Sequence, residues 1–198
     1  MVFYTIVYQL IKTYNKPMTP ITITHEIPPV WNSESRILIL GTMPSPASRE
    51  AGFFYMHPQN RFWKVVPTVF GEELKFPNSD AKNPDLRPLA IQERLDFLLR
   101  HQLALWDVLS SCDINGASDA SIKNALPNDF TKILSNSKIT KVFCTGKTSY
   151  NLWNKFCAEK YETQFNLKTE CLPSTSPANA AWTFERLVEA YSKIAETV

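Results

Sequence analysis

The sequence lacks a long hydrophobic run, a large excess of charge of either sign, and any closely spaced pair of cysteines. No stretch approaches the roughly 20 apolar residues that a membrane-spanning helix needs. The first 16 residues are apolar, but Gln9 and Lys12 interrupt them, and they have neither a basic leader nor a small-residue cleavage site, which argues against a signal peptide. We therefore expect a cytoplasmic protein without a membrane partner.

The cysteines are far apart in the sequence, and none belongs to a C-x-x-C pair: Cys112, Cys144, Cys157 and Cys171. Zinc ribbons and compact iron–sulfur motifs need such pairs. The spacing therefore argues against both, and nothing else in the sequence requires a metal or a cofactor. Three of the cysteines lie in apolar segments, where a free thiol in a reducing cytosol packs as a small hydrophobic side chain.

Charge and length leave the class of partner open. The 21 basic and 19 acidic residues give a net charge of +2, which neither indicates nor excludes a nucleic acid, because a small enzyme can grip a few phosphates with a local basic patch. A chain of 198 residues with 44% hydrophobic content fits one compact domain. We expect residues 26–198 to form this domain and residues 1–25 to be an N-terminal appendage of uncertain role.

Short aliphatic runs that alternate with helical periodicity predict an α/β fold. Strands are expected at residues 36–40, 103–109, 141–144 and 169–172. Helices are expected from Arg61 (with Pro67 inside or at the end), over residues 89–101, from Lys147 and over residues 180–196, with a polar turn after residue 109 and a helix and a loop over residues 121–136. This order predicts a single-domain, three-layer α/β/α fold with a central, mostly parallel four-stranded sheet. Since ligands of such folds bind at the carboxyl ends of the strands, the loops after Leu40, Leu109 and Leu172 should form the site.

The loop after the first strand carries the richest chemistry. It reads Gly41-Thr-Met-Pro-Ser-Pro-Ala-Ser48 and continues as Gly52-Phe-Phe-Tyr-Met-His-Pro-Gln-Asn-Arg-Phe-Trp63. The glycine and the two prolines predict a tight loop whose backbone N–H groups can face a ligand. Aromatic side chains beside His57, Asn60 and Arg61 suit a planar base next to a phosphate. In the alternative interpretation the aromatics only cover the core, and Asn60 caps the helix that starts at Arg61.

Two further loops follow strands of the predicted sheet. In Leu172-Pro-Ser-Thr-Ser-Pro-Ala-Asn-Ala180, the hydroxyls and the start of the next helix can bind phosphate oxygens, or they form an ordinary capped helix start. Thr145-Gly-Lys-Thr-Ser149 is similar to the end of a P-loop, but Lys141 stands where that motif needs glycine, so we expect no NTPase. Lys147 remains a candidate contact for DNA phosphate.

Asp107 lies near the carboxyl end of the second strand, within the apolar run Leu105-Trp-Asp-Val-Leu109. An acidic residue in such a place is either a structural partner of a buried polar group or a site residue. In a site, its carboxylate can accept a hydrogen bond from a ring N–H of a base. The sequence leaves both interpretations open.

In this order the segments resemble the uracil-DNA glycosylase superfamily. The resemblance is carried by LILGTMPSPASREAGFFYMHPQNRFWKV, from Leu38 to Val65, and is supported by ALWDVLSSC and LPSTSPA. It covers Pro28 to the C-terminus and is nearest to the deoxyinosine (hypoxanthine)-DNA glycosylases, next to the mismatch-specific uracil/thymine-DNA glycosylases. It implies a glycosylase-like catalytic domain that hydrolyses the N-glycosidic bond of a flipped deaminated base in DNA. Hypoxanthine is the expected base, and an abasic site is the expected product.

The resemblance also assigns residues. Most of the superfamily has Asp or Asn before the first loop's proline to position the attacking water, whereas this chain has Met43, which cannot orient water. In the deoxyinosine branch the essential polar residue corresponds to Asn60. Tyr55 or Phe54 is expected to stack on the flipped base, and Asp107 to read its edge. The implied base pocket consists of Gly41, Thr42, Met43, Pro44, Ser45, Phe54, Tyr55, His57 and Asp107.

The resemblance further implies how DNA is held. The segment Ser174–Asn179 corresponds to a loop that enters the minor groove and keeps the duplex open. The candidate DNA contacts are Arg49, Arg61, Lys147, Ser174, Thr175, Ser176, Pro177, Ala178 and Asn179. We expect a monomer with DNA containing deaminated bases as its partner and no obligate protein partner.

An amide takes up no proton near neutral pH, so Asn60 must either orient a water or contact the leaving base. Most of the catalysis would then come from N–H groups near Gly41–Ser45 that stabilise negative charge on that base. Three alternatives remain: a glycosylase that prefers uracil or acts on several bases including xanthine, a non-catalytic DNA-damage-binding protein of the same fold, which Met43 favours, and a hydrolase of free nucleosides.

Overall fold

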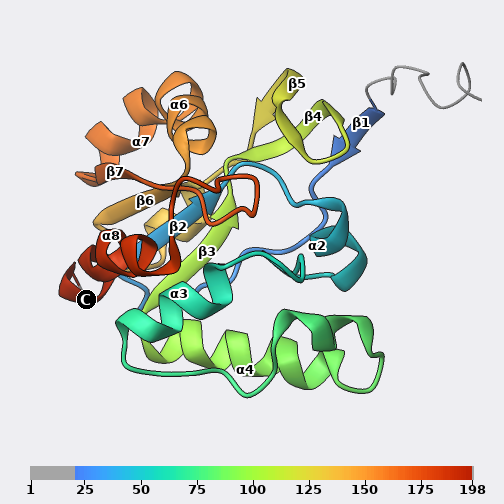
Figure 1. The fold of residues 1–198 in the computed structure, drawn as a ribbon. Coiled ribbons are helices and arrows are strands. Elements are labelled where there is room, and N and C mark those ends of the chain that lie inside the picture. Colours follow the sequence, from blue (N-terminus) through green and yellow to red (C-terminus); the bar gives the residue numbers. More distant parts are fainter. Residues whose placement is uncertain (1–20, 198) are drawn as a thin grey trace, which may run out of the picture.

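The computed structural model describes residues 21–197 and shows a parallel sheet between two layers of helices, with a smaller antiparallel sheet beside it (Figure 1). The parallel sheet has the order β3-β2-β6-β7 and consists of β2 (Ile37–Gly41), β3 (Leu103–Asp107), β6 (Lys141–Thr145) and β7 (Lys168–Leu172). The antiparallel sheet has the order β1-β4-β5 and consists of β1 (Ile21–Thr24), β4 (Leu109–Asn115) and β5 (Ser118–Pro127). The predicted three-layer fold and its four central strands are confirmed.

Helices cover both faces of the central sheet because its strands are apolar on both sides. One face packs against α3 (Phe62–Val69), α4 (Arg87–Arg100) and α8 (Phe184–Thr197), and the other against α5 (Thr131–Ser135), α6 (Lys147–Phe156) and α7 (Ala158–Phe165). The short helix α2 (Pro46–Ala51) and the 3-10 helix η1 (Asn78–Lys82) lie in the connections between β2 and α4. Along β2, Ile37 and Ile39 face the first layer, while Leu38 and Leu40 face the second.

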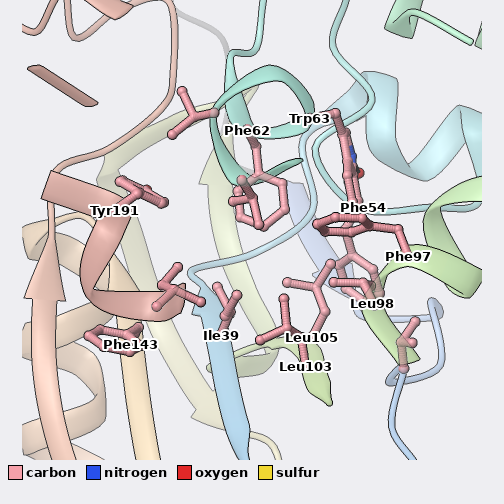
Figure 2. Packing of buried hydrophobic residues seen from close by; sticks show 14 of the residues in the cluster. Ile39, Phe54, Phe62, Trp63, Phe97, Leu98, Leu103, Leu105, Phe143 and Tyr191 are labelled. Carbon is pink, nitrogen blue, oxygen red and sulfur yellow. Dashed lines mark hydrogen bonds between the residues drawn. The ribbon is translucent and has the colours of Figure 1, made fainter. Parts of the chain in front are cut away.

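Figure 2 shows the core on the α3, α4 and α8 side. Aromatic side chains from the helices meet aliphatic side chains from the strands there: Phe62, Trp63, Phe97 and Tyr191 against Ile39, Leu103 and Leu105. Pro67 lies inside α3, two residues before its last residue, Val69. Because a proline has no N–H to donate, the helix lacks one hydrogen bond near its end. This layer anchors the segment that leads from the first loop into α3.

The antiparallel sheet was not predicted from the sequence. A polar turn followed by a helix and a loop was expected, but β4 and β5 form a hairpin up to Pro127, and α5 spans only Thr131–Ser135. Most of β5 is exposed or half-buried, and its pairing with β4 has three register shifts. The strand therefore has no clean alternation of apolar and polar residues by which it could be recognised.

Residues 21–25 of the predicted N-terminal appendage take part in this sheet. β1 pairs with β4 from Ile21 opposite Ile114 to Thr24 opposite Ser111, and the N–H of His25 donates to the Ser110 carbonyl at 2.7 Å. Residues 1–20 lie outside the described part of the chain. The boundary expected after residue 25 thus follows directly on a paired strand.

The register of the central sheet brings all four strands to a common edge. Gly41 pairs with Asp107, and Thr145 pairs with Leu172. The residues after these positions therefore open at the same carboxyl edge, as predicted for the loops after Leu40 and Leu172. The loop expected after Leu109 is not present, because β3 ends at Asp107 and Leu109 begins β4. The last helix begins at Phe184, four residues later than expected, and Thr183 caps it by accepting the N–H of Arg186 at 3.3 Å.

Three of the cysteines are buried and all four are free, as expected, with Cys171 exposed. Among residues 21–197 no helix is long and apolar enough to cross a membrane. Within the same residues no group of three or more His, Cys, Asp and Glu side chains could hold a metal ion.

Candidate active site

A cavity of about 650 Å³ opens at the carboxyl edge of the central sheet. This volume is in the range of pockets that hold small organic molecules. The loop after β2, the segment leading to α3, the end of β3, the β4–β5 hairpin, the start of α6 and the segment after β7 all contribute to it. The predicted site residues that line it are Gly41, Thr42, Met43, Pro44, Ser45, Phe54, Tyr55, His57, Asn60, Asp107, Lys147, Ser174, Ser176, Pro177, Ala178 and Asn179.

Asp107 lies on the floor of the cavity, and one of its carboxylate oxygens is bound to another side chain. Its Oδ2 atom is 2.9 Å from Nε2 of His25, and both side chains are buried. Its Oδ1 atom lies so close to Gly41 that a Cβ atom there would be only 2.2 Å away. His25 was not predicted as a site residue, because it follows a short strand that was itself not predicted. The carboxylate is therefore held in one orientation from two sides.

Tyr55 forms the wall next to this floor. Its hydroxyl is 2.7 Å from Oγ1 of Thr145, and its ring stacks on Phe62 at 4.0 Å with an angle of 6° between the planes. Burial raises the pKa of Tyr55 well above its ordinary value, so the hydroxyl stays neutral. Since Phe62 covers one face of the ring, a base could stack only on the other.

The side chain of Asn60 is oriented by its carbonyl oxygen. Oδ1 accepts the N–H of Phe62 at 3.0 Å and the hydroxyl of Thr175 at 2.9 Å. A backbone N–H can only donate, which fixes which end of the amide is the oxygen. Among the described residues the Nδ2 group has no acceptor, and Asn60 lines the cavity. The helix cap considered from the sequence is not formed as expected, because α3 starts at Phe62 and its N-cap residue is Arg61, without a side-chain cap bond. Asn60 still accepts the N–H of Phe62, and its NH₂ group remains available as a donor.

A buried pair that sequence reasoning missed holds the segment around Asn60. The Nδ2 group of Asn78 donates to the carbonyls of Tyr55 at 3.0 Å and His57 at 2.9 Å, and Arg94 donates to Oδ1 of Asn78 at 3.0 Å. Burial lowers the pKa of Arg94 to about 10. Arg94 lies on the buried face of α4 with Ala90, Phe97 and Leu98. The position of Arg94 on an apolar face of the helix was the one feature of the sequence that indicated the Asn78–Arg94 pair.

Arg61 was predicted to contact phosphate, but its guanidinium donates to carbonyl groups inside the protein. It donates to the carbonyl of Ser176 at 2.8 Å, to that of Asn179 at 3.0 Å, to that of Thr175 at 3.3 Å, and to that of Trp182. Its forked donors match a ring of carbonyl oxygens. The prediction for Thr175 is also wrong, since this residue is buried with its hydroxyl on Asn60. Arg61 instead joins the start of α3 to the segment after β7.

Arg49 lies outside the cavity lining and donates to the Pro44 carbonyl at 2.7 Å. The exposed Lys147, by contrast, lines the cavity as the first residue of α6, behind Gly146 with its φ of 118°. A helix N-terminus with unpaired N–H groups favours negative charge, and a cation beside it adds to this. This rim of the cavity can therefore take a phosphate.

The loop after β2 offers further donors. Among the described residues, the backbone N–H groups of Thr42, Met43 and Ser45 have no protein acceptor, and these residues line the cavity. Pro44 has no N–H. Such N–H groups can stabilise negative charge that develops on a bound group.

The β4–β5 hairpin supplies lining residues that were absent from the sequence-based site: Ile114, Gly116, Ala117, Ser118 and Asp119. Oδ2 of Asp119 accepts the hydroxyl of Thr42 at 3.0 Å. The hairpin thus reaches over the end of the parallel sheet to the loop after β2. Because the hairpin itself was not predicted, neither was this side of the cavity.

Comparisons with known proteins agree with this arrangement. The family model described as the uracil DNA glycosylase superfamily matches residues 28–195. A protein of Methanosarcina barkeri named hypoxanthine DNA glycosylase is 32% identical over 143 residues, which cover 72% of this chain and 83% of that protein. One of the same name from Methanosarcina acetivorans is 28% identical over 167 residues, 83% of this chain and 93% of that protein. The solution NMR structure of a candidate uracil DNA glycosylase from Methanosarcina acetivorans has a TM-score of 0.65 at 23% identity, covering 88% of this chain and 99% of that one.

Proposed function

The chain belongs to the uracil DNA glycosylase superfamily and is a DNA N-glycosylase, and we propose that the base it removes is hypoxanthine, excised from deoxyinosine in DNA. The name of the two Methanosarcina relatives supports this choice of base. The observation that carries it is the orientation of Asn60, whose carbonyl oxygen is occupied while its NH₂ group is free at the cavity. Asp107 offers an acceptor on the same cavity wall.

A donor amide and an acceptor carboxylate suit hypoxanthine better than adenine. Hypoxanthine has a carbonyl oxygen and an N1–H, whereas the N1 atom of adenine is an acceptor. The Oδ1 atom of Asp107 can accept the N1–H, because its other oxygen is held by His25. The free face of Tyr55 can stack on the base, which contributes about 1–3 kcal/mol. Flipping costs a few kcal/mol and less for a mispaired base, which favours damaged sites.

The bond to the sugar then breaks through an oxocarbenium-like transition state. Asn60 does not orient the water through its oxygen, since that atom already accepts two hydrogen bonds. Its NH₂ group instead donates to the departing base. The N–H groups of Thr42, Met43 and Ser45 stabilise the same negative charge, and loss of one such donor costs about 10²–10³ in rate.

The rim of the cavity holds the DNA. The segment Ser174–Asn179, which Arg61 fastens by its carbonyls, is the wedge that enters the minor groove. Lys147 and the first N–H groups of α6 bind a phosphate next to the flipped nucleotide. DNA-bound bases, rather than free nucleosides, are therefore the proposed substrates.

The test is single-turnover excision from matched oligonucleotides that contain hypoxanthine, uracil or xanthine, with free deoxyinosine in parallel. We expect hypoxanthine to be released fastest from DNA, and Asn60→Ala to abolish release while the thermal unfolding curve stays close to that of the wild type. Asn60→Asp is the matched variant, because it keeps the acceptor for the Phe62 N–H and replaces the NH₂ donor by a negatively charged oxygen.

Full activity of Asn60→Asp would exclude the donor role of the amide. Faster release of uracil or xanthine would identify a different or broader base preference. Tight binding of inosine DNA without an abasic product would identify a damage-binding protein, and cleavage of free deoxyinosine alone would identify a nucleoside hydrolase.

A further inference from the structure

We propose that Asp119, beside the turn of the β4–β5 hairpin, is the general base that activates the attacking water. The inference rests on the glycosylase function proposed above and adds the residue that takes up the proton of the water. Asn60 cannot do this, because an amide takes up no proton near neutral pH. Met43 cannot do it either, since it has no ionisable group.

The ionisable side chains that line the cavity are Tyr55, His57, Asp107, Asp119 and Lys147. Nδ1 of His57 accepts the N–H of Gln59 at 3.2 Å, so the lone pair of this histidine is used. Tyr55 is a neutral hydroxyl, and Lys147 is a cation at the rim. These three are therefore poor proton acceptors, and two carboxylates remain.

Asp107 and Asp119 differ in their surroundings. Asp107 is buried on the floor, where its Oδ2 atom is on His25 and where the flipped base would lie. Asp119 is exposed, has one hydrogen bond to its Oδ2 atom from Thr42, and has no partner for Oδ1 among the described residues. A general base must reach water as well as substrate. Asp119 meets this requirement and Asp107 does not.

The bond from Thr42 also decides where Asp119 acts. Thr42 belongs to the loop whose N–H groups face the developing charge of the base, and it precedes Met43 in the chain. The base lies deeper, towards Asp107, so the sugar lies nearer to the mouth of the cavity. The hairpin therefore brings a carboxylate next to the place where water meets the sugar.

In the proposed step the water oxygen bonds to C1′ while the bond from C1′ to the base nitrogen breaks. The electron pair of that bond leaves with hypoxanthine as an anion, which Asn60 and the loop N–H groups stabilise. One proton of the water passes to the carboxylate of Asp119. The products are an abasic sugar with a hydroxyl at C1′ and a base that takes up a proton from solvent.

Electrostatics favour this assignment. Although the residue as a whole is exposed, protein atoms shield its carboxylate in part, and this loss of hydration raises the pKa of Asp119. The negative charge of Asp107 acts in the same direction, and the hydrogen bond from Thr42 acts against both. The other ionisable group beside the carboxylate is Cys112 on β4, whose thiol also senses the charges of Asp113 and Arg49. Tyr55, His57 and Lys147 line the same cavity. A carboxylate with a raised pKa is the stronger base.

The test measures the single-turnover excision rate against pH for the wild type, Asp119→Asn and Thr42→Val, with binding of the uncleaved oligonucleotide and thermal unfolding measured in parallel. We expect Asp119→Asn to lower the rate by about 10²-fold or more, to leave binding unchanged, and to remove the fall in rate on the acidic side. Thr42→Val should move that fall to higher pH, because loss of a hydrogen bond to the ionised form raises the pKa of Asp119.

Asp113→Asn is the matched control, since Asp113 lies on the same hairpin outside the cavity lining. Its rate and pH profile should equal those of the wild type. An Asp119→Asn variant that keeps both the rate and the acidic limb would overturn the inference. A wild type that releases no base from any oligonucleotide would instead refute the proposed function. If the wild type releases uracil only, the role of Asp119 can still be decided on that substrate.

Discussion

Gly41 is where the backbone of β2 comes closest to the floor of the cavity. A Cβ atom at this position would lie 2.2 Å from Oδ1 of Asp107 and 2.9 Å from the hydroxyl of Tyr55. Neither group can move freely, because His25 holds Asp107 and Thr145 holds Tyr55. The glycine is required here for space.

Gly41→Ala should therefore displace Asp107 and Tyr55 from the base. We expect the rate of excision to fall by about 10²-fold, as misplacement by about 1 Å typically does. Gly52→Ala is the control, because a Cβ atom there meets nothing within 4 Å and only the strain of a φ of 72° is added. Single-turnover excision and thermal unfolding of both variants are the measurements. Equal rates for Gly41→Ala and the wild type would contradict the described floor.

The candidate site could be predicted residue by residue only where a motif was available. Asn60 and Asp107 were found because each stands in a recognisable segment. The pattern did not reveal where each side chain points, so Arg61 was assigned to DNA although it binds carbonyls. Asp119 was missed because β5 has no clear apolar alternation. His25 was missed because it follows a strand of only four residues, within a segment that was expected to be an appendage.

At the scale of elements, Arg61 and Lys147 are two basic residues with different tasks. Arg61 joins α3 to the segment after β7, while Lys147 is exposed at the start of α6. A residue that contacts phosphate changes the salt dependence of DNA binding, and one that supports a loop does not.

Lys147→Gln should weaken binding to any DNA and should reduce the slope of log K against log salt by about 1. Arg61→Lys should weaken binding and excision without changing that slope, because a lysine cannot replace the forked donors to the loop carbonyls. Binding titrations at several salt concentrations separate the two cases. A smaller slope for Arg61→Lys would mean that the guanidinium does reach DNA.

The strands and helices could be predicted from the sequence where nearly all residues of a strand are buried. Three central strands, β2, β3 and β6, are mostly buried and therefore have runs of apolar residues in the sequence. The edge strand β7 is largely exposed or half-buried and has only a weak pattern of this kind. The hairpin of β4 and β5 has polar residues, three register shifts and a positive φ at Asn124. Because of these irregularities its residues do not alternate between apolar and polar, so the hairpin could not be predicted from the sequence. The start of α8 was placed too early because the carbonyls of the preceding segment bind Arg61 instead of continuing a helix.

The whole molecule depends on how its two sheets are joined. β1 closes one edge of the small sheet, and His25, which follows it, reaches the floor of the cavity in the large one. Residues 21–25 therefore connect a peripheral strand with the site. The first residue matched by the family model is 28, so this connection lies outside the matched range.

A chain that begins at residue 26 should be less stable than one that begins at residue 21. Removal of His25 leaves Asp107 buried without its hydrogen-bond partner, which costs about 1–3 kcal/mol, and removal of β1 exposes one edge of β4. We expect the shorter chain to lose excision as well. Urea unfolding and single-turnover rates of the two chains isolate the effect of residues 21–25. Identical curves would assign these residues to a dispensable appendage.

The floor of the cavity belongs to the parallel sheet, whereas Asp119 lies on the β4–β5 hairpin of the antiparallel sheet. Substitutions in the hairpin turn can therefore accumulate without displacing Gly41, Tyr55 or Asp107. Under the general-base role proposed above, a change at Asp119 alters the activation of water while the contacts of the floor stay in place.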